Sequence, residues 1–173
     1  MMPVFMEFAD KMRALPRYKD YQFVVAAAPS RSMSDYSSYI GGRESYVKVV
    51  FGQSYAVLRH AEAAVVNSGT ASLETALIGT PQVVAYKGAE INFLIAKQII
   101  KIKYISLGNL ILNRTCFREL LQFYFTPENV LEEVIRMIED TEYRETMLAG
   151  YQEIRDALGG RGASAAVAKA MIE

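Results

Sequence analysis

Residues 67–74, Asn-Ser-Gly-Thr-Ala-Ser-Leu-Glu, combine small side chains, hydroxyls and one carboxylate in a segment suited to binding an anion. Gly69 lets the backbone approach a ligand closely, while Ser68 and Thr70 offer hydroxyl groups. A helix is expected to follow, and its free N-terminal amides and positive dipole end favour phosphate. Glu74 lies about one helical turn beyond Thr70, so its carboxylate can reach a ligand hydroxyl at the same end. A capping box is the alternative, but the spacing from Thr70 to Glu74 is one residue too long for it.

A second candidate segment, residues 106–114, places Asn109 between apolar residues and Arg114 five positions later. An asparagine amide can recognise an amide or a hydroxyl, and an arginine can hold a phosphate through two parallel hydrogen bonds. The alternative is that Asn109 satisfies backbone groups of its own loop while Arg114 is solvated. Turn chemistry taken alone favours that alternative.

Other classes of chemistry find no support in these residues. The glycine patterns of dinucleotide-binding loops and of P-loops are both absent from residues 67–74. Because Cys116 is the only cysteine, an internal disulfide and a cysteine-based zinc site are excluded. The only histidine that could activate Cys116 as a nucleophile is His60. Nineteen basic and 19 acidic side chains give a formal net charge of zero, which argues against a nucleic-acid partner. We expect no metal and no redox cofactor.

The elements that must position the two segments alternate between strand and helix along the 173 residues. This alternation predicts an α/β fold, a Rossmann-like parallel sheet with helices on both faces, whose ligands bind beyond the carboxyl ends of the strands. We assign residues 1–140 to this domain and residues 141–173 to C-terminal helices. Strands are expected at 21–28, 46–50, 63–66 and 82–86, with a short extended piece at 104–106; helices are expected at 4–15, 33–40, 53–59, 71–78, 90–100, 127–139, 142–158 and 163–172.

Residues 91–112 are the most apolar stretch, and they include Lys97, Lys101 and Lys103. Each lysine would cost about 2.5–3.5 kcal/mol at bilayer depth, so we do not expect this stretch to span a membrane. A helix lying in the membrane surface and a helix packed on the sheet both suit the pattern, and the packed helix is favoured. The first residues lack the features of a signal peptide, which predicts a cytoplasmic protein.

From residue 67 to about residue 122 the sequence resembles the donor-nucleotide domain of the lipid-A-disaccharide synthase family. A strand followed by Ser-Gly-Thr and a helix would suit many glycosyltransferases, whereas the ordered series of motifs is much more specific. The matching pieces are S-G-T-A-S-L-E at 68–74, G-T-P-Q-V-V-A-Y-K at 79–87, A-K at 96–97, Y-I-S-L-G-N-L-I at 104–111 and E-L-L-Q at 119–122. Gly108 and Glu90 depart from the family pattern, which usually has proline at both positions.

The resemblance implies a GT-B glycosyltransferase, in which two Rossmann-like domains face each other and the C-terminal one holds most of the nucleotide-sugar. Members transfer diacylglucosamine from UDP-diacylglucosamine to lipid X, forming the lipid A disaccharide precursor and UDP, at the cytoplasmic face of the inner membrane. In this chain, Ser68, Gly69 and Thr70 would lie at the diphosphate, and Glu74 would bind ribose hydroxyls. The final two residues of the expected site, Asn109 and Arg114, would face the donor.

Two features of the family are missing from the sequence: the L-P-G-S-R loop upstream of the first helix, and the N-terminal domain with the acceptor side and the catalytic acidic residue. We therefore expect the C-terminal half of the enzyme, without a catalytic residue of its own and inactive alone. Its helices at 141–173 could pack on the missing domain, and it could contact the inner membrane peripherally. The alternatives are a non-catalytic sugar-nucleotide-binding subunit, or another GT-B enzyme such as a UDP-N-acetylglucosamine epimerase or transferase.

Overall fold

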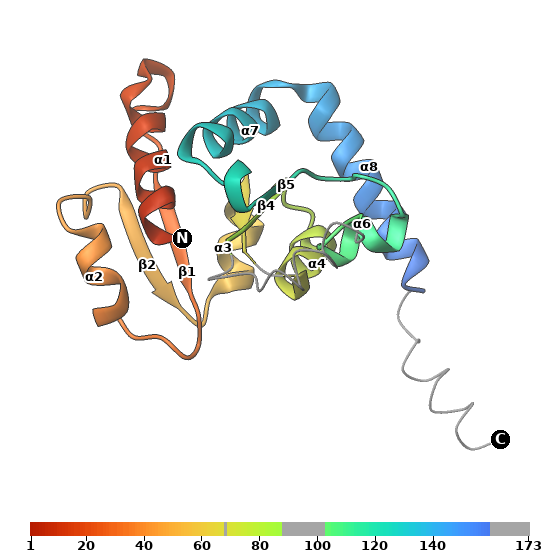
Figure 1. Ribbon diagram of the computed structural model, residues 1–173, viewed down its shortest axis with the longest axis horizontal. Helices are drawn as coiled ribbons and strands as arrows, with labels where there is room; N and C mark the ends of the chain where they lie inside the picture. The colour runs from red at the N-terminus through yellow and green to blue at the C-terminus, as the bar shows by residue number, and fades with distance from the viewer. Residues whose placement is uncertain (68, 88–102, 160–173) are drawn as a thin grey trace.

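Parallel strands and helices alternate through the computed structural model, which describes residues 1–67, 69–87 and 103–159 (Figure 1). The strands predicted near 21–28, 46–50, 63–66 and 82–86 are confirmed, as are the helices on either side of them and the two that follow residue 126. The helices expected at 90–100 and 163–172 lie outside the described residues. The elements are α1 (Met2–Ala14), η1 (Pro16–Tyr18), β1 (Phe23–Ala27), α2 (Ser34–Ile40), β2 (Val47–Phe51), α3 (Ser54–His60), β3 (Ala64–Val66), α4 (Gly69–Ile78), β4 (Gln82–Tyr86), α6 (Leu107–Leu112), β5 (Glu119–Leu121), η2 (Gln122–Tyr124), α7 (Pro127–Glu139) and α8 (Thr141–Ala157).

The described strands form two parallel sheets rather than the one that their alternation with helices predicts. In the first, β1 pairs with β2 in a register that places Phe23 opposite Val47. In the second, β4 lies between β3 and β5, with Val84 opposite both Val66 and Glu119. All pairs are parallel, as expected for strands joined by helical connections. The carboxyl ends of β3, β4 and β5 therefore lie at one edge of their sheet.

No strand forms at residues 104–106, where a short extended piece is expected, and a strand that was not predicted forms beyond them. The last strand of the sheet is β5, which follows the six-residue helix α6. The backbone N–H groups of Ile105 and Ser106 donate to the carboxylate of Glu119 at 2.9 and 3.0 Å, so a side chain takes the place of a partner strand. A three-residue strand is too short to produce a readable alternation of polar and apolar residues.

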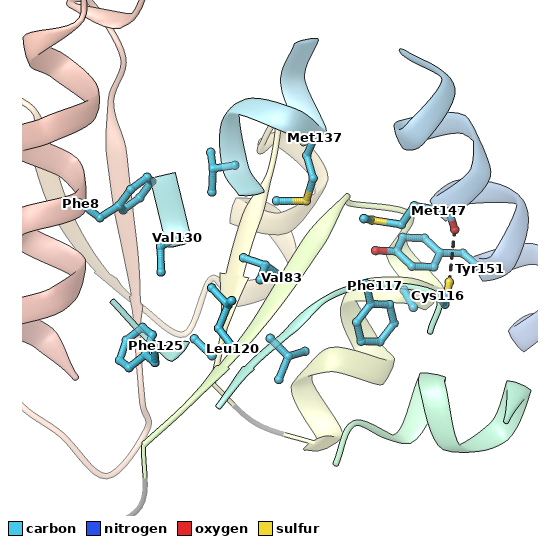
Figure 2. Packing of buried hydrophobic residues seen from close by; sticks show 14 of the residues in the cluster. Phe8, Val83, Cys116, Phe117, Leu120, Phe125, Val130, Met137, Met147 and Tyr151 are labelled. Atoms are coloured by element: carbon cyan, nitrogen blue, oxygen red, sulfur yellow. Dashed lines mark hydrogen bonds between the residues drawn. The ribbon is translucent and has the colours of Figure 1, made fainter. Parts of the chain in front are cut away.

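The core lies between β4 and the helices that cover it (Figure 2). Val83 and Val84 point to opposite faces of β4 and are both buried, which is usual for a strand covered on both faces. Phe8 reaches the same cluster from α1, and Val130 reaches it from α7. From α8 come Met147, Tyr151 and Ile154, so α8 belongs to the same core as the second sheet.

Residue types in the sequence explain where α7 begins and where α1 ends. Thr126 precedes α7, and its hydroxyl accepts a hydrogen bond from the N–H of Asn129 at 3.2 Å, while Pro127 takes the first helical position. The helix α1 ends at Ala14, two residues before Pro16. Among the helices in the described ranges, none has both the length and the apolar character needed to cross a membrane.

Candidate functional site

The helix α4 begins directly beyond the carboxyl end of β3, the position where parallel sheets bind ligands. It starts at Gly69, two residues earlier than predicted, so Gly69 and Thr70 lie in its first turn. Thr70 is exposed, whereas the hydroxyl of the buried Ser72 donates to the carbonyl of Gly69 at 2.6 Å. Ser68 falls outside the described residues. The positive end of the helix dipole lies at this helix start and can meet an anion, and Thr70 can add a hydroxyl.

Glu74 lies on α4, half-buried, and its carboxylate faces the hydroxyl of Tyr55 on α3. The negative charge of Glu74 and its hydrogen bond with that hydroxyl raise the pKa of Tyr55. Tyr55 is itself exposed. The Glu74 carboxylate has lone pairs with which it could accept hydrogen bonds from the hydroxyls of a ligand.

The segment that leads into α6 lies against the start of α4. A Cβ atom added to Gly69 would be 3.8 Å from the carbonyl oxygen of Ile105, and the two helices pack against each other. The fold therefore brings together the first turn of α4 and residues 105–107, which lie far apart in the sequence.

Asn109 lies in α6 and is fully buried. Its amide nitrogen donates to the carbonyl of Phe117 at 2.8 Å and to the carboxylate of Glu119 at 2.9 Å. Its amide oxygen accepts from the N–H groups of Cys116 at 2.7 Å and Phe117 at 3.3 Å. Both donor hydrogens and both lone pairs of this side chain are used within the protein. Asn109 therefore fixes the loop between α6 and β5, as the backbone-satisfying alternative anticipated.

Glu119, at the start of β5, is the residue of this region that sequence reasoning missed. Its carboxylate accepts from the backbone N–H groups of Ile105 and Ser106, from the Ser106 hydroxyl and from Asn109. These contacts hold residues 105–106 in place beside α4. Its sequence signal was its place in the resemblance motif E-L-L-Q, whereas its partners lie 10 to 14 residues away in the sequence.

Arg114 follows α6 and turns toward α8. Its guanidinium donates to Glu153 at 2.6 Å, and a Cβ atom on Gly150 would lie 3.5 Å from it. Both of these partners belong to α8. Of the predicted site residues, the structure thus places Gly69, Thr70 and Glu74 on α4, with Asn109 behind them as a scaffold and Arg114 against α8.

Gln122 also lies at the carboxyl edge of this sheet, immediately after β5. Its φ is 50°, a left-handed conformation that is uncommon for a residue other than glycine. Its side-chain nitrogen is buried and has no hydrogen-bond partner among the described residues. Buried polar atoms are normally paired, so this amide has donor capacity to spare. The resemblance motif E-L-L-Q contains Gln122, and that was the available signal.

Neither Cys116 nor His60 forms a reactive centre. Burial raises the pKa of the Cys116 thiol to about 11, so it stays protonated near neutral pH. The His60 ring lies 2.8 Å from the carbonyl of Ala56, at the end of α3. Within residues 1–67, 69–87 and 103–159, no three or more His, Cys, Asp or Glu side chains gather as a metal ion would require.

Comparison with known proteins gives a consistent match over nearly the whole chain. The family model described as Lipid-A-disaccharide synthetase matches residues 1–171. The chain is 34% identical over 173 residues to the lipid-A-disaccharide synthase of Anaeromyxobacter dehalogenans (strain 2CP-C), covering 99% of this chain and 45% of that protein. It is 37% identical over 152 residues to that of Myxococcus xanthus (strain DK1622), covering 88% of this chain and 40% of that protein. The chain thus spans less than half the length of these relatives.

Proposed function

Because the chain belongs to the Lipid-A-disaccharide synthetase family of glycosyltransferases, we propose that it is the donor-nucleotide-binding half of such an enzyme. In this proposal it is the C-terminal half of a GT-B fold and binds UDP-diacylglucosamine through the UDP group. The acceptor, lipid X, binds to the other half of the full-length enzyme. Transfer takes place at the cytoplasmic face of the inner membrane, which the protein contacts peripherally.

The observation that carries the proposal is the position of the α4 N-terminus at the carboxyl end of β3. Gly69 and Thr70 occupy its first turn, where the positive end of the helix dipole favours a diphosphate. We assign Ser68, Gly69 and Thr70 to the diphosphate, and we assign Glu74 to the ribose hydroxyls. The exposed side chain of Thr70 supports this assignment, because its hydroxyl is open to a ligand.

Asn109 and Arg114 take indirect roles in this proposal. Asn109 has no free hydrogen-bonding group, so it acts on the donor through Glu119, which holds residues 105–106 beside α4. Arg114 forms an ion pair with Glu153, which supports a structural role for it. This ion pair would have to break before Arg114 could bind a phosphate. Gln122 joins the donor site, because its unpaired amide nitrogen can donate to an oxygen of the nucleotide.

The chemistry follows from these assignments. Transfer of the sugar breaks its bond to the diphosphate, and negative charge then develops on the departing UDP. The α4 amides would stabilise that charge in the transition state more than in the bound substrate, which is what lowers a barrier. Deprotonation of the acceptor hydroxyl falls to a base on the other half of the enzyme. The chain alone should therefore bind UDP without forming the disaccharide.

Isothermal titration calorimetry of the chain with UDP, and with uridine as the matched ligand lacking the diphosphate, tests this proposal. We expect UDP to bind with a Kd of roughly 0.1–1 mM, equivalent to about 4–5.5 kcal/mol, and uridine to bind more weakly. An absence of UDP binding at millimolar concentration would reject the donor site. Tight binding of UDP-N-acetylglucosamine in preference to the diacylated donor would favour another GT-B enzyme. Disaccharide formation by the purified chain would overturn the assignment of the base to the other half.

A further inference from the structure

We propose that the exposed aromatic side chains at the carboxyl ends of β4 and β5 bind an acyl chain of the sugar-nucleotide donor. The rings are those of Tyr86, Phe123 and Tyr124. The inference rests on the proposed function, because it takes the donor to be a diacylated UDP-sugar bound at the start of α4. It adds a subsite that selects the donor by its apolar part rather than by its nucleotide.

The three rings belong to residues at the ends of two neighbouring strands. Tyr86 is the last residue of β4, and it lies opposite Leu121, the last residue of β5. Phe123 and Tyr124 follow directly in η2. Parallel sheets bind their ligands at the carboxyl ends of the strands, which is also where α4 begins after β3. The aromatic residues therefore border the candidate site rather than the opposite edge of the sheet.

The exposure of these rings distinguishes them from the aromatic residue that follows them. Phe123 is 95% exposed, Tyr124 is 69% exposed and Tyr86 is 39% exposed. Phe125, by contrast, is buried, and its ring meets that of Phe5 edge to face at 5.3 Å. Burial of an aromatic ring favours folding strongly, and two successive residues of η2 forgo most of that gain. Exposed apolar side chains gathered in one place commonly mark a surface that binds a ligand.

The orientation of the donor places its sugar on the same side as these rings. The Glu74 carboxylate, which we assign to ribose, faces the Tyr55 hydroxyl on α3. α3 packs against β1 and α4, and Figure 1 shows it on the side of α4 nearer to β1, with α6 on the other side. The ribose therefore lies on the side of the diphosphate that is away from β4. Because a UDP-sugar is a linear chain of nucleoside, diphosphate and sugar, the sugar extends toward β4 and β5.

The spacing of the strands suits the length of such a ligand. β4 lies between β3 and β5, and neighbouring strands are about 4.8 Å apart, so the ends of β3 and β5 are roughly 10 Å apart. A sugar attached to a diphosphate at the α4 start spans part of this distance, and an acyl chain on the sugar spans the rest. Gln122, immediately before Phe123, adds a polar group, because its buried amide nitrogen has no partner among the described residues. That nitrogen can donate to an oxygen of the donor, such as the carbonyl that joins an acyl chain to the sugar.

Calorimetric titration of the full chain with three ligands tests the proposal. The ligands are UDP, UDP-N-acetylglucosamine and UDP-dihexanoylglucosamine, whose short acyl chains keep it from forming micelles. We expect the dihexanoyl donor to bind at least about tenfold more tightly than UDP-N-acetylglucosamine, which is the gain from covering roughly 60 Å² of apolar surface. Phe123→Ala should remove most of that gain, and it should change the affinity for the other two ligands by less than about twofold.

Two further variants separate acyl binding from other effects of the substitution. Phe123→Leu keeps an apolar side chain without a ring, so it should retain most of the gain from the acyl chains. Tyr39→Ala removes an exposed ring from α2 and should leave all three affinities unchanged. Because Phe123 is almost fully exposed, thermal unfolding of Phe123→Ala should coincide with that of the unsubstituted protein, which excludes unfolding as the cause of weaker binding.

The possible results distinguish this inference from the proposed function. An equal loss of affinity for UDP-N-acetylglucosamine and the dihexanoyl donor in Phe123→Ala would overturn the acyl assignment, because the ring would then contact the sugar. Unchanged donor affinity, with weaker sedimentation of Phe123→Ala on vesicles of phosphatidylethanolamine and phosphatidylglycerol, would overturn it in favour of a contact with the membrane surface. If UDP binds and the acyl chains add nothing, this inference fails while the donor site stands. If none of the three ligands binds, the proposed function fails and this inference fails with it.

Discussion

The side-chain amide of Asn109 donates to the carboxylate of Glu119 at 2.9 Å, which ties α6 to the first residue of β5. The same carboxylate holds the backbone of Ile105 and Ser106 beside the start of α4. A buried amide, whose hydrogen-bonding groups are all used within the protein, thus determines where one wall of the candidate site lies. Substitution of Asn109 should therefore lower the free energy of unfolding as well as the affinity for a ligand.

Asn109→Ala should lower the free energy of unfolding by at least about 2 kcal/mol. The substitution leaves the buried N–H groups of Cys116 and Phe117 unpaired, and each such group costs about 1–3 kcal/mol. Urea unfolding followed by circular dichroism measures the change. The matched control is Leu110→Ala on the same helix, where a side chain 46% exposed should change stability by less than about 1 kcal/mol. Equal losses in the two variants would contradict the role given to Asn109.

Gly150→Ala should destabilise the protein by about 1–3 kcal/mol, because the added Cβ would overlap the sulfur of Cys116. In a Cys116→Ala background the same change should become neutral or stabilising. The obstructing sulfur is then absent, and alanine favours a helix by about 1 kcal/mol over glycine. A double-mutant cycle of unfolding free energies measures this reversal. If the two substitutions are simply additive, the contact between these residues is not the reason for the glycine.

Tyr18 should make stability fall as the solution becomes alkaline. Burial, together with the hydrogen bond to Glu139, raises the pKa of Tyr18 to about 12, above the value of about 10 for an unfolded tyrosine. This group therefore contributes stability that is complete below pH 10 and is lost as the pH rises from 10 through 12. Tyr18→Phe should flatten the stability profile in that interval. Tyr124→Phe, at an exposed position, should leave the profile steep, and an equal effect from both variants would contradict the prediction.

Asp10 should contribute to the opposite end of the pH profile. Three hydrogen bonds from the Arg43 guanidinium, with a fourth from Tyr46, lower the pKa of Asp10. Its contribution is present above the pKa of about 3.9 of an unfolded aspartate and is lost as the pH falls through the lower folded value. Asp10→Asn should reduce stability at pH 7 and make acid unfolding less steep below pH 4. The control is Asp156→Asn at an exposed position. If the stability of both variants depends on acid pH in the same way as that of the unsubstituted protein, Asp10 does not make the predicted contribution.

Glu74→Gln should weaken UDP binding by about 10- to 100-fold, since a hydrogen bond to a charged acceptor is worth about 1.5–3 kcal/mol. Glu74 is half-buried and its described partner is the exposed Tyr55, so the unfolding midpoint should change little. Calorimetric titration with UDP measures the affinity, and Glu145→Gln on the exposed face of α8 serves as the control. An unchanged affinity in Glu74→Gln would remove Glu74 from the site.

Much of the local structure could be read from the sequence, because it depends on near neighbours. The threonine and proline at 126 and 127 determine where α7 begins, and the apolar run in β4 identifies a buried strand. The small residues after β3 likewise predict a turn into α4, although the helix starts two residues earlier than expected. In each case a hydrogen bond or a hydrophobic period spans only a few residues.

The partners of the polar side chains were decided by the tertiary structure. Arg114 pairs with Glu153, 39 residues away, and Asn109 turns inward to satisfy the loop before β5. The division of the strands into two sheets has the same origin, because a strand edge is paired or free according to which segment lies beside it. Residue types and their spacing indicate which groups a side chain can bind. Which group it binds depends on the folded chain, where burial makes an unpaired polar atom costly and brings distant segments within hydrogen-bonding distance.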